Sequence, residues 1–230
     1  KRWGLVDSFE KDLKVLILTN HMENIAGSEI VALEVAESFQ KYGCNVKIYA
    51  NQIGLPMADI VRDSGIELDD SDQYPNPFDF DIIWSQHHVI PLLISTNIES
   101  KNDRPYFIFA HLSPYEPLET VGLYTEHIFA DKILVNSHET KERLESLGVE
   151  TDKIEIFYNA SPSSFQSASK VNLLKNILLI SNHPPQELLE AIKILEKKNN
   201  IRVSHIGTRG RYKRLQPSHI AENDAVITIG

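Results

Sequence analysis

The sequence predicts an α/β fold in which a mainly parallel β-sheet carries helices on both faces. Two observations predict this fold class. Short, unbroken apolar runs such as residues 15–18 are typical of parallel strands that are covered on both sides. These runs alternate along the chain with helical segments, and such an alternation favours a doubly wound sheet.

The first expected strand, residues 15–18, leads into a helix that starts after Ala26. Gly43 follows this helix at the position where a left-handed cap is expected. Apolar residues fall on one face of the helix: Val31, Ala32, Val35, Ala36 and Phe39. Further strands are expected at residues 45–50, 82–84, 106–110, 132–135 and 154–158, further helices at 56–64, 89–98, 118–129 and 137–147, and a polar loop at 69–81.

A second α/β unit is expected after a linker. Residues 159–172 are rich in Ser, contain Pro162 and lack periodicity. Three strands and about one and a half helices are too few for a finished doubly wound domain, so we expect a fragment or a longer protein that continues beyond Gly230. The expected strands are residues 176–180, 201–206 and 225–229, the helix is 185–198, and the domains are 1–160, a linker at 161–173, and 174–230.

Composition excludes several classes of protein. A formal net charge of −9 over 230 residues argues against broad nucleic-acid binding, because phosphate contacts need clustered Lys and Arg. The single Cys44 excludes an intrachain disulfide framework and a Cys-based zinc site. No apolar stretch approaches about 18 residues, so no membrane-spanning helix is expected. The chain starts without Met and without an apolar signal core; we find no targeting segment and expect the natural N-terminus to be missing.

The turn between the first strand and the first helix is the strongest candidate for a ligand site. Ala26, Gly27 and Ser28 are small, so a ligand could approach their backbone closely. The free N–H groups at a helix start attract anions. Glu29 lies in the first helical turn, where it either complements the helix dipole or takes part in the site. The turn therefore predicts a phosphate or sugar site.

Four segments carry a resemblance to a known family. Residues 26–33 look like its Gly-Gly-x-Glu loop and first helix, and residues 106–111 look like its strand that ends in a site histidine. Residues 133–137 look like its Val-x-x-Ser stretch, and residues 148–159 match the pattern that closes its first domain. In this order, they resemble GT-B glycosyltransferases of the retaining family-4 type. The resemblance implies a Rossmann-like acceptor-side domain followed by a partial Rossmann-like donor-side domain.

The resemblance implies roles for several of these residues. Gly27, with Ala26 and Ser28, would let the loop pass close to the donor diphosphate or the acceptor, although Ala26 stands where the family often has Gly. His111 would lie beside the transferred sugar, and Glu29 would share the catalytic site. His21, beyond the first strand, is an alternative candidate for a general base. Asn159 is expected either beside the ligand or in an Asx turn.

The second unit departs from the family pattern. Arg209 and Arg211 belong to a basic run that either neutralises a nucleotide diphosphate or forms a solvated loop face. Residues 181–185 do not reproduce the usual Gly-Arg…Lys pattern, and the Glu-x7-Glu segment is absent, so we expect the fragment alone to be inactive. His87 and His88 invite a metal interpretation, but adjacent residues on a strand diverge, so no metal site is expected.

The resemblance implies a glycosyltransferase that moves a sugar from a nucleotide-sugar donor to a glycan or lipid-linked acceptor. The nucleotide sugar is a co-substrate, and neither a cofactor nor a metal is expected. The family resemblance implies retention of anomeric configuration, a role in polysaccharide biosynthesis, and a cytoplasmic location with peripheral contact to the inner face of the membrane. The alternatives are a noncatalytic sugar- or nucleotide-binding or partner subunit of the same fold, and a sugar-nucleotide epimerase of GT-B shape.

Overall fold

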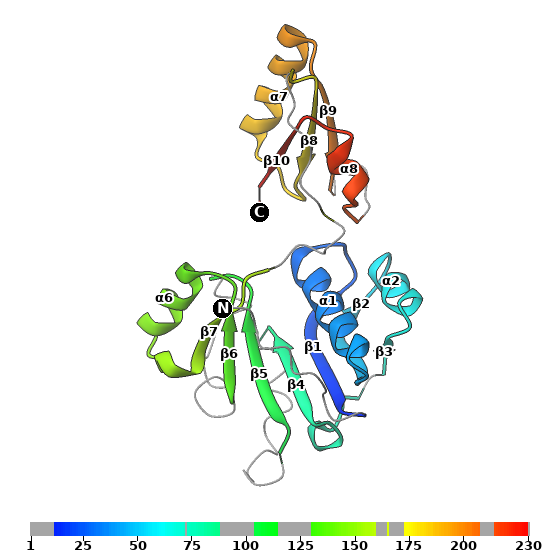
Figure 1. The fold of residues 1–230 in the computed structure, drawn as a ribbon, viewed down its shortest axis with the longest axis vertical. Coiled ribbons are helices and arrows are strands. Elements are labelled where there is room, and N and C mark those ends of the chain that lie inside the picture. The colour runs from blue at the N-terminus through cyan, green and yellow to red at the C-terminus, as the bar shows by residue number, and fades with distance from the viewer. Residues whose placement is uncertain are drawn as a thin grey trace. The chain divides into compact units, whose positions relative to one another are not determined.

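A computed structural model describes residues 12–71, 73–87, 104–114, 130–159, 165, 173–207 and 214–229. The chain divides into two compact units, residues 1–159 and residues 160–230, which we call the first and second unit. Each is described by itself (Figure 1).

The first unit contains a seven-stranded parallel sheet with the order β3-β2-β1-β4-β5-β6-β7. The strands start as predicted, with an apolar run at the centre of each longer strand. The main corrections to the prediction are at three places: the first strand continues to Met22, the last ends at Ile156, and residues 67–69 form an edge strand too short to show a pattern. The strands are β1 (Lys14–Met22), β2 (Asn45–Ile53), β3 (Glu67–Asp69), β4 (Ile82–Gln86), β5 (Tyr106–His111), β6 (Lys132–Val135) and β7 (Ile154–Ile156).

Helices cover both faces of this sheet, so the predicted fold class is confirmed (Figure 1). Helices α1 (Gly27–Lys41) and α2 (Met57–Asp63) pack on the face that carries Val15, Ile17 and Trp84. Helix α6 (His138–Ser146) packs through Leu144 on the opposite face. Short 3₁₀ turns are formed by η1 (Pro77–Asp79) and η3 (Thr151–Lys153). The helices predicted at residues 89–98 and 118–129 lie outside the described residues.

Successive residues of each strand alternate between these two faces. On β1, Val15 and Ile17 belong to the core under α1, whereas Leu16 and Leu18 belong to the core under α6. Because of this alternation, the face on which a side chain lies follows from its position in the strand. Cys44 lies in the core under α1, and burial raises the pKa of its thiol.

The second unit has a three-stranded parallel sheet with the order β10-β8-β9. The strands are β8 (Asn176–Ile180), β9 (Arg202–Ile206) and β10 (Ala225–Thr228), close to the predicted ranges. Helix α7 (Gln186–Asn199) was expected from its periodicity, whereas the short helix α8 (Pro217–Ala221) was not. Five residues are too few for a helical pattern to show in a sequence.

An aspartate directly before a strand joins it to the start of the neighbouring strand in three places. The backbone N–H of Asp81 donates to the carbonyl oxygen of Lys14 at 2.9 Å, and the backbone N–H of Lys14 donates to the carboxylate of Asp81 at 2.8 Å. Asp131 and Phe107 do the same at 2.9 and 2.8 Å, as do Asp224 and Asn176 at 2.8 and 2.7 Å. We call this pair of bonds the aspartate bracket. Because the strands are parallel, the two brackets of the first unit lie at the amino-terminal edge of its sheet.

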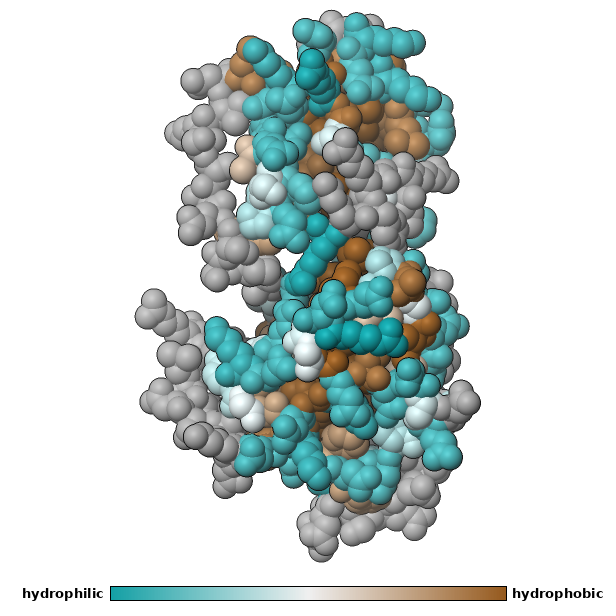
Figure 2. Space-filling model, turned by 90° about the vertical axis from the view of Figure 1, so that its right-hand side faces the viewer, coloured by the Kyte–Doolittle hydropathy of each residue, from teal (hydrophilic) through white to brown (hydrophobic). Residues whose placement is uncertain are grey.

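The surface follows the expected distribution of polarity. Figure 2 shows mainly hydrophilic side chains, with hydrophobic ones visible in the recesses between them. Among the described residues, no helix combines the length and the apolar character that crossing a membrane requires.

Candidate functional site

The strand order of the first unit changes direction between β1 and β4. The chain passes from β1 outward to β2 and β3, and then returns to place β4 on the other side of β1. Open α/β sheets bind ligands outside the carboxyl ends of the strands at such a switch point. In this protein, the carboxyl ends of β1 and β4 and the start of α1 meet there.

Helix α1 starts directly after Ala26, at the turn that the sequence singled out as a candidate ligand site. Ala26 stands at the N-cap, and no side chain caps the helix there. A Cβ built on Gly27 would meet no atom of the described residues within 4 Å, and the φ angle of Gly27 is not in the left-handed region. The fold itself therefore does not require glycine at this position.

Glu29 is buried behind this turn rather than exposed at it. Its side chain is 4% exposed, and the hydroxyl of Ser28 donates a 2.7 Å hydrogen bond to its Oε2. The carboxylate lies in the first turn of α1, where it complements the helix dipole.

Gln86 ties the end of β4 to the start of α1. Its side chain is fully buried, and its Nε2 donates to the carbonyl oxygen of Ser28 at 2.5 Å and to Oγ1 of Thr19 at 3.2 Å. Sequence reasoning missed both Gln86 and Thr19. The available signal was that each is a polar residue close after the apolar run of its strand.

His87 follows Gln86 and contacts the same region. It is 3% exposed and has a φ of +78°, which is uncommon for a residue with a bulky side chain. Its Nδ1 accepts a 3.1 Å hydrogen bond from the backbone N–H of Asn20 and lies 3.3 Å from Oγ1 of Thr19. Among the described residues, no group of three or more His, Cys, Asp or Glu side chains could hold a metal ion, and His88 lies outside them.

His21 lies in a chain of polar side chains across β1 and β2. Its Nδ1 is 2.9 Å from Oε1 of Gln52, so Nδ1 is the donor of that bond. Its Nε2 is 2.8 Å from Nδ2 of Asn20 and is therefore the acceptor, while Asn51 donates to Oδ1 of Asn20 at 2.9 Å.

His111 ends β5 and is fully buried. Its ring packs on that of Phe109, with the centroids 4.6 Å apart, and Phe109 belongs to the core under α6. Residues two apart on a strand share a face, so His111 projects from the face opposite to α1. Strand β4 also separates β5 from β1. The structure therefore does not bring His111 together with Gly27 and Glu29 in one cluster of described side chains.

The remaining candidates are placed as follows. Asn159 is exposed and ends the first unit. Arg209 and Arg211 lie outside the described residues. In the second unit, Nε2 of His205 lies 2.8 Å from the carbonyl oxygen of Ser181. Because a carbonyl oxygen can only accept, Nε2 carries the proton and donates this bond. A Cβ on Gly207, which has a φ of +143°, would lie 1.9 Å from that same oxygen. This turn after β8 is therefore packed tightly against the end of β9.

Comparison with known proteins identifies the fold. No protein-family model and no curated protein sequence matches the chain. Among solved structures, Anabaena HepE in complex with UDP-glucose aligns with a TM-score of 0.59 at 15% identity over 95% of this chain and 69% of HepE. A glycosyltransferase from Rickettsia africae aligns with a TM-score of 0.55 at 15% identity, over 96% of this chain and 69% of that one.

A third structure of the same fold carries a different assignment. A Listeria monocytogenes protein assigned as a UDP-N-acetylglucosamine 2-epimerase aligns with a TM-score of 0.52 at 14% identity, over 91% of this chain and 65% of that one. At identities this low, the likeness concerns the fold. The chain has a Rossmann-like GT-B fold, and it spans about two thirds of the length of these structures.

Proposed function

We propose that this chain is part of a glycosyltransferase that uses a nucleotide-sugar donor. The observation that carries the proposal is the α1 start at the β1–β4 switch point, with an uncapped helix end and a glycine that the fold does not need. HepE, which shares the fold, was solved with UDP-glucose, and this supports a uridine nucleotide sugar as the first donor to test.

In the proposed reaction, the backbone N–H groups at the start of α1 face the anionic or hydroxyl groups of the ligand. Gly27 admits the ligand to the backbone, and Ser28 and Glu29 fix the first helical turn through their 2.7 Å bond. His21, held by Gln52 and Asn20, would present a polar edge to the ligand. No metal ion takes part, because helix N–H groups and basic side chains stabilise the leaving diphosphate.

The finer assignments rest on the family resemblance of the first-unit motifs. They are retention of anomeric configuration, a glycan or lipid-linked acceptor, and work at the inner face of the membrane as part of polysaccharide synthesis. A retaining reaction does not require a protein base, so the role that the resemblance implies for His111 is to orient groups of the ligand.

A second candidate is a sugar-nucleotide epimerase of the same fold. The alignment with the Listeria protein favours it, because that likeness is nearly as strong as the likeness to the Rickettsia glycosyltransferase. A noncatalytic binding subunit is the third possibility, and Ala26 in place of the family's first Gly is consistent with it.

The test is a thermal-shift panel of UDP, GDP, dTDP and ADP sugars on the full-length protein. A ligand at 100 times its Kd stabilises the folded state by about 2.7 kcal/mol, which is easily measured. The binding sugar is then incubated with the protein, and NMR distinguishes a transferred sugar, an epimerised sugar and an unchanged sugar. If none of the nucleotide sugars stabilises the protein, donor binding is refuted for all three candidates.

A further inference from the structure

Two consecutive residues at the end of β4 hold both ends of the segment that forms the candidate site. We call residues 20–28 the site segment. Nδ1 of His87 accepts from the backbone N–H of Asn20 at 3.1 Å, at the beginning of the segment. Nε2 of Gln86 donates to the carbonyl oxygen of Ser28 at 2.5 Å, at its end. Thr19 joins the two, because its Oγ1 lies 3.2 Å from Gln86 Nε2 and 3.3 Å from His87 Nδ1.

The orientation of both side chains follows from their partners. A flipped Gln86 amide would place Oε1 against the carbonyl oxygen of Ser28, and two acceptors repel each other. His87 must leave Nδ1 unprotonated to accept from Asn20, so a neutral imidazole carries its proton on Nε2. Gln86 therefore donates a hydrogen bond to the site segment, whereas His87 accepts one from it.

Two features of this arrangement are energetically unfavourable, and neither is required to form the sheet. Oε1 of Gln86 is buried and, within the described part of the chain, has no hydrogen-bond partner. His87 occupies the left-handed region at a φ of +78°, immediately after the last paired residue of β4. An apolar residue at position 86 and a relaxed turn at 87 would avoid both costs. Unpaired buried groups and strained backbone cluster where function has fixed a geometry.

We propose that Gln86 and His87 are positioning residues that hold the site segment in its ligand-binding conformation before the ligand arrives. The inference rests on the proposed function for the identity of the ligand, a nucleotide sugar. Holding the segment in advance lowers the ordering cost of binding, so its effect appears in affinity. The residues act through Asn20, Ser28 and Thr19.

The test replaces Gln86 by Met in the full-length protein. Methionine has a similar size and removes both the donor and the unpaired acceptor, so the core should remain folded. Amide hydrogen exchange is measured without ligand, and UDP-glucose binding is measured by calorimetry. We expect exchange at residues 23–28 to become about tenfold faster or more, exchange in β5 and β6 to stay unchanged, and the Kd for UDP-glucose to rise by a similar factor.

Matched variants separate positioning from general destabilisation. Gln40→Met changes the same residue type in the last turns of α1, where Nε2 of Gln40 binds the carbonyl oxygen of Gly65 at 3.3 Å, and should leave the site segment unchanged. If Gln86→Met does not fold, Thr19→Val removes the shared hydroxyl, and Thr19→Ser should restore slow exchange. Unchanged exchange at residues 23–28, or an equal rise in β5 and β6, would overturn the proposal. Wild-type protein that does not bind UDP-glucose would refute this donor alone, because exchange is measured without ligand.

Discussion

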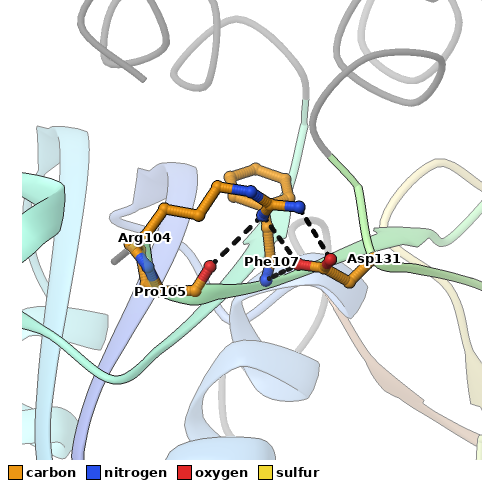
Figure 3. Close-up of polar contacts among 4 residues, drawn as sticks. All are labelled: Arg104, Pro105, Phe107 and Asp131. Carbon is orange, nitrogen blue, oxygen red and sulfur yellow. Dashed lines mark hydrogen bonds and ion pairs between the residues drawn. The ribbon is translucent and has the colours of Figure 1, made fainter. Parts of the chain in front are cut away.

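Arg104 and Asp131 form a two-bond ion pair at the entrance to β5 and β6. Nη1 and Nη2 of Arg104 donate to Oδ2 and Oδ1 of Asp131, each at 2.7 Å, and Oδ2 of Asp131 also accepts the backbone N–H of Phe107 at 2.8 Å. Figure 3 shows dashed lines that join both the Arg104 guanidinium and the Phe107 backbone to the carboxylate of Asp131. The carboxylate therefore fixes the register of two strands and is itself held in place by Arg104.

Loss of this ion pair should destabilise the first unit. In Arg104→Leu, Asp131 keeps its bond to Phe107 but loses its counter-charge, and the side chains of the pair are only 15% and 27% exposed. We expect a loss of about 2 kcal/mol in the free energy of unfolding, measured by urea denaturation. The control is Glu145→Gln, which removes a longer ion pair, with 3.8 Å between Glu145 and Lys141. It should lower the free energy of unfolding by less than about 0.5 kcal/mol. Equal effects of the two variants would contradict the prediction.

Substitution of Gly27 by Ala should separate stability from binding. The added Cβ meets no atom within 4 Å, and alanine restricts the unfolded chain more than glycine does. We expect the protein to become more stable by about 0.4–1 kcal/mol while UDP-glucose binding weakens, as measured by denaturation and calorimetry. Gly148→Ala is the control, because a φ of +92° makes that alanine destabilising. Wild-type affinity in Gly27→Ala would show that no ligand approaches this backbone closely.

The second unit should lose stability in acid through Asp224. Backbone hydrogen bonds from Asn176 and Lys175 lower the pKa of its carboxyl group in the folded state. A carboxyl whose folded pKa is depressed contributes stability above its unfolded pKa, about 3.9, and this stability is lost as pH falls through the folded value. We expect Asp224→Asn to be less stable than wild type at neutral pH and to lose less stability on acidification.

Urea denaturation monitored in the second unit across this pH range tests the prediction. Glu190→Gln, which alters an exposed helix residue bonded to Gln186 at 3.2 Å, provides the matched neutralisation. Identical pH profiles for wild type and Asp224→Asn would count against the bracket as the source of acid sensitivity.

Gly207→Ala should disrupt the turn after β8. The new Cβ would lie 1.9 Å from the carbonyl oxygen of Ser181, and backbone cannot move aside cheaply. We expect a loss of about 2–4 kcal/mol in the stability of the second unit, seen as faster amide exchange in β8 and β9. Gly43→Ala has a similarly positive φ of +87° but no atom within 4 Å, so it should cost less. A Gly207→Ala variant with unchanged exchange would refute the close approach.

The strands were predictable because their apolar runs are local properties of the sequence. Residues 132–135 and 176–180 match their strands for this reason. Strand β3 was not predictable, because its three residues are placed by pairing with Lys47, Ile48 and Tyr49 of β2. The pairing of an edge strand depends on a partner that is distant in the sequence, so no local sequence pattern predicts it.

The candidate site was predictable only where it is local. The small turn at Gly27 and the helix after it follow from neighbouring residues. Gln86 was missed because its role depends on the pairing of Leu18 with Ser85, which brings the ends of β1 and β4 together. The direction of His111 could have been predicted, since it continues the alternation of Phe107 and Phe109, both buried under α6.

The aspartate brackets have a consequence for protein engineering. They fix strand register at the amino-terminal edge of the first sheet, whereas the site segment and Gln86 lie at the other edge. A graft of residues 20–28 together with 86–87 from another member of this fold would leave every bracket intact. We therefore expect this graft to transfer ligand preference between chains of low sequence identity, while the strands of the recipient sheet keep their register.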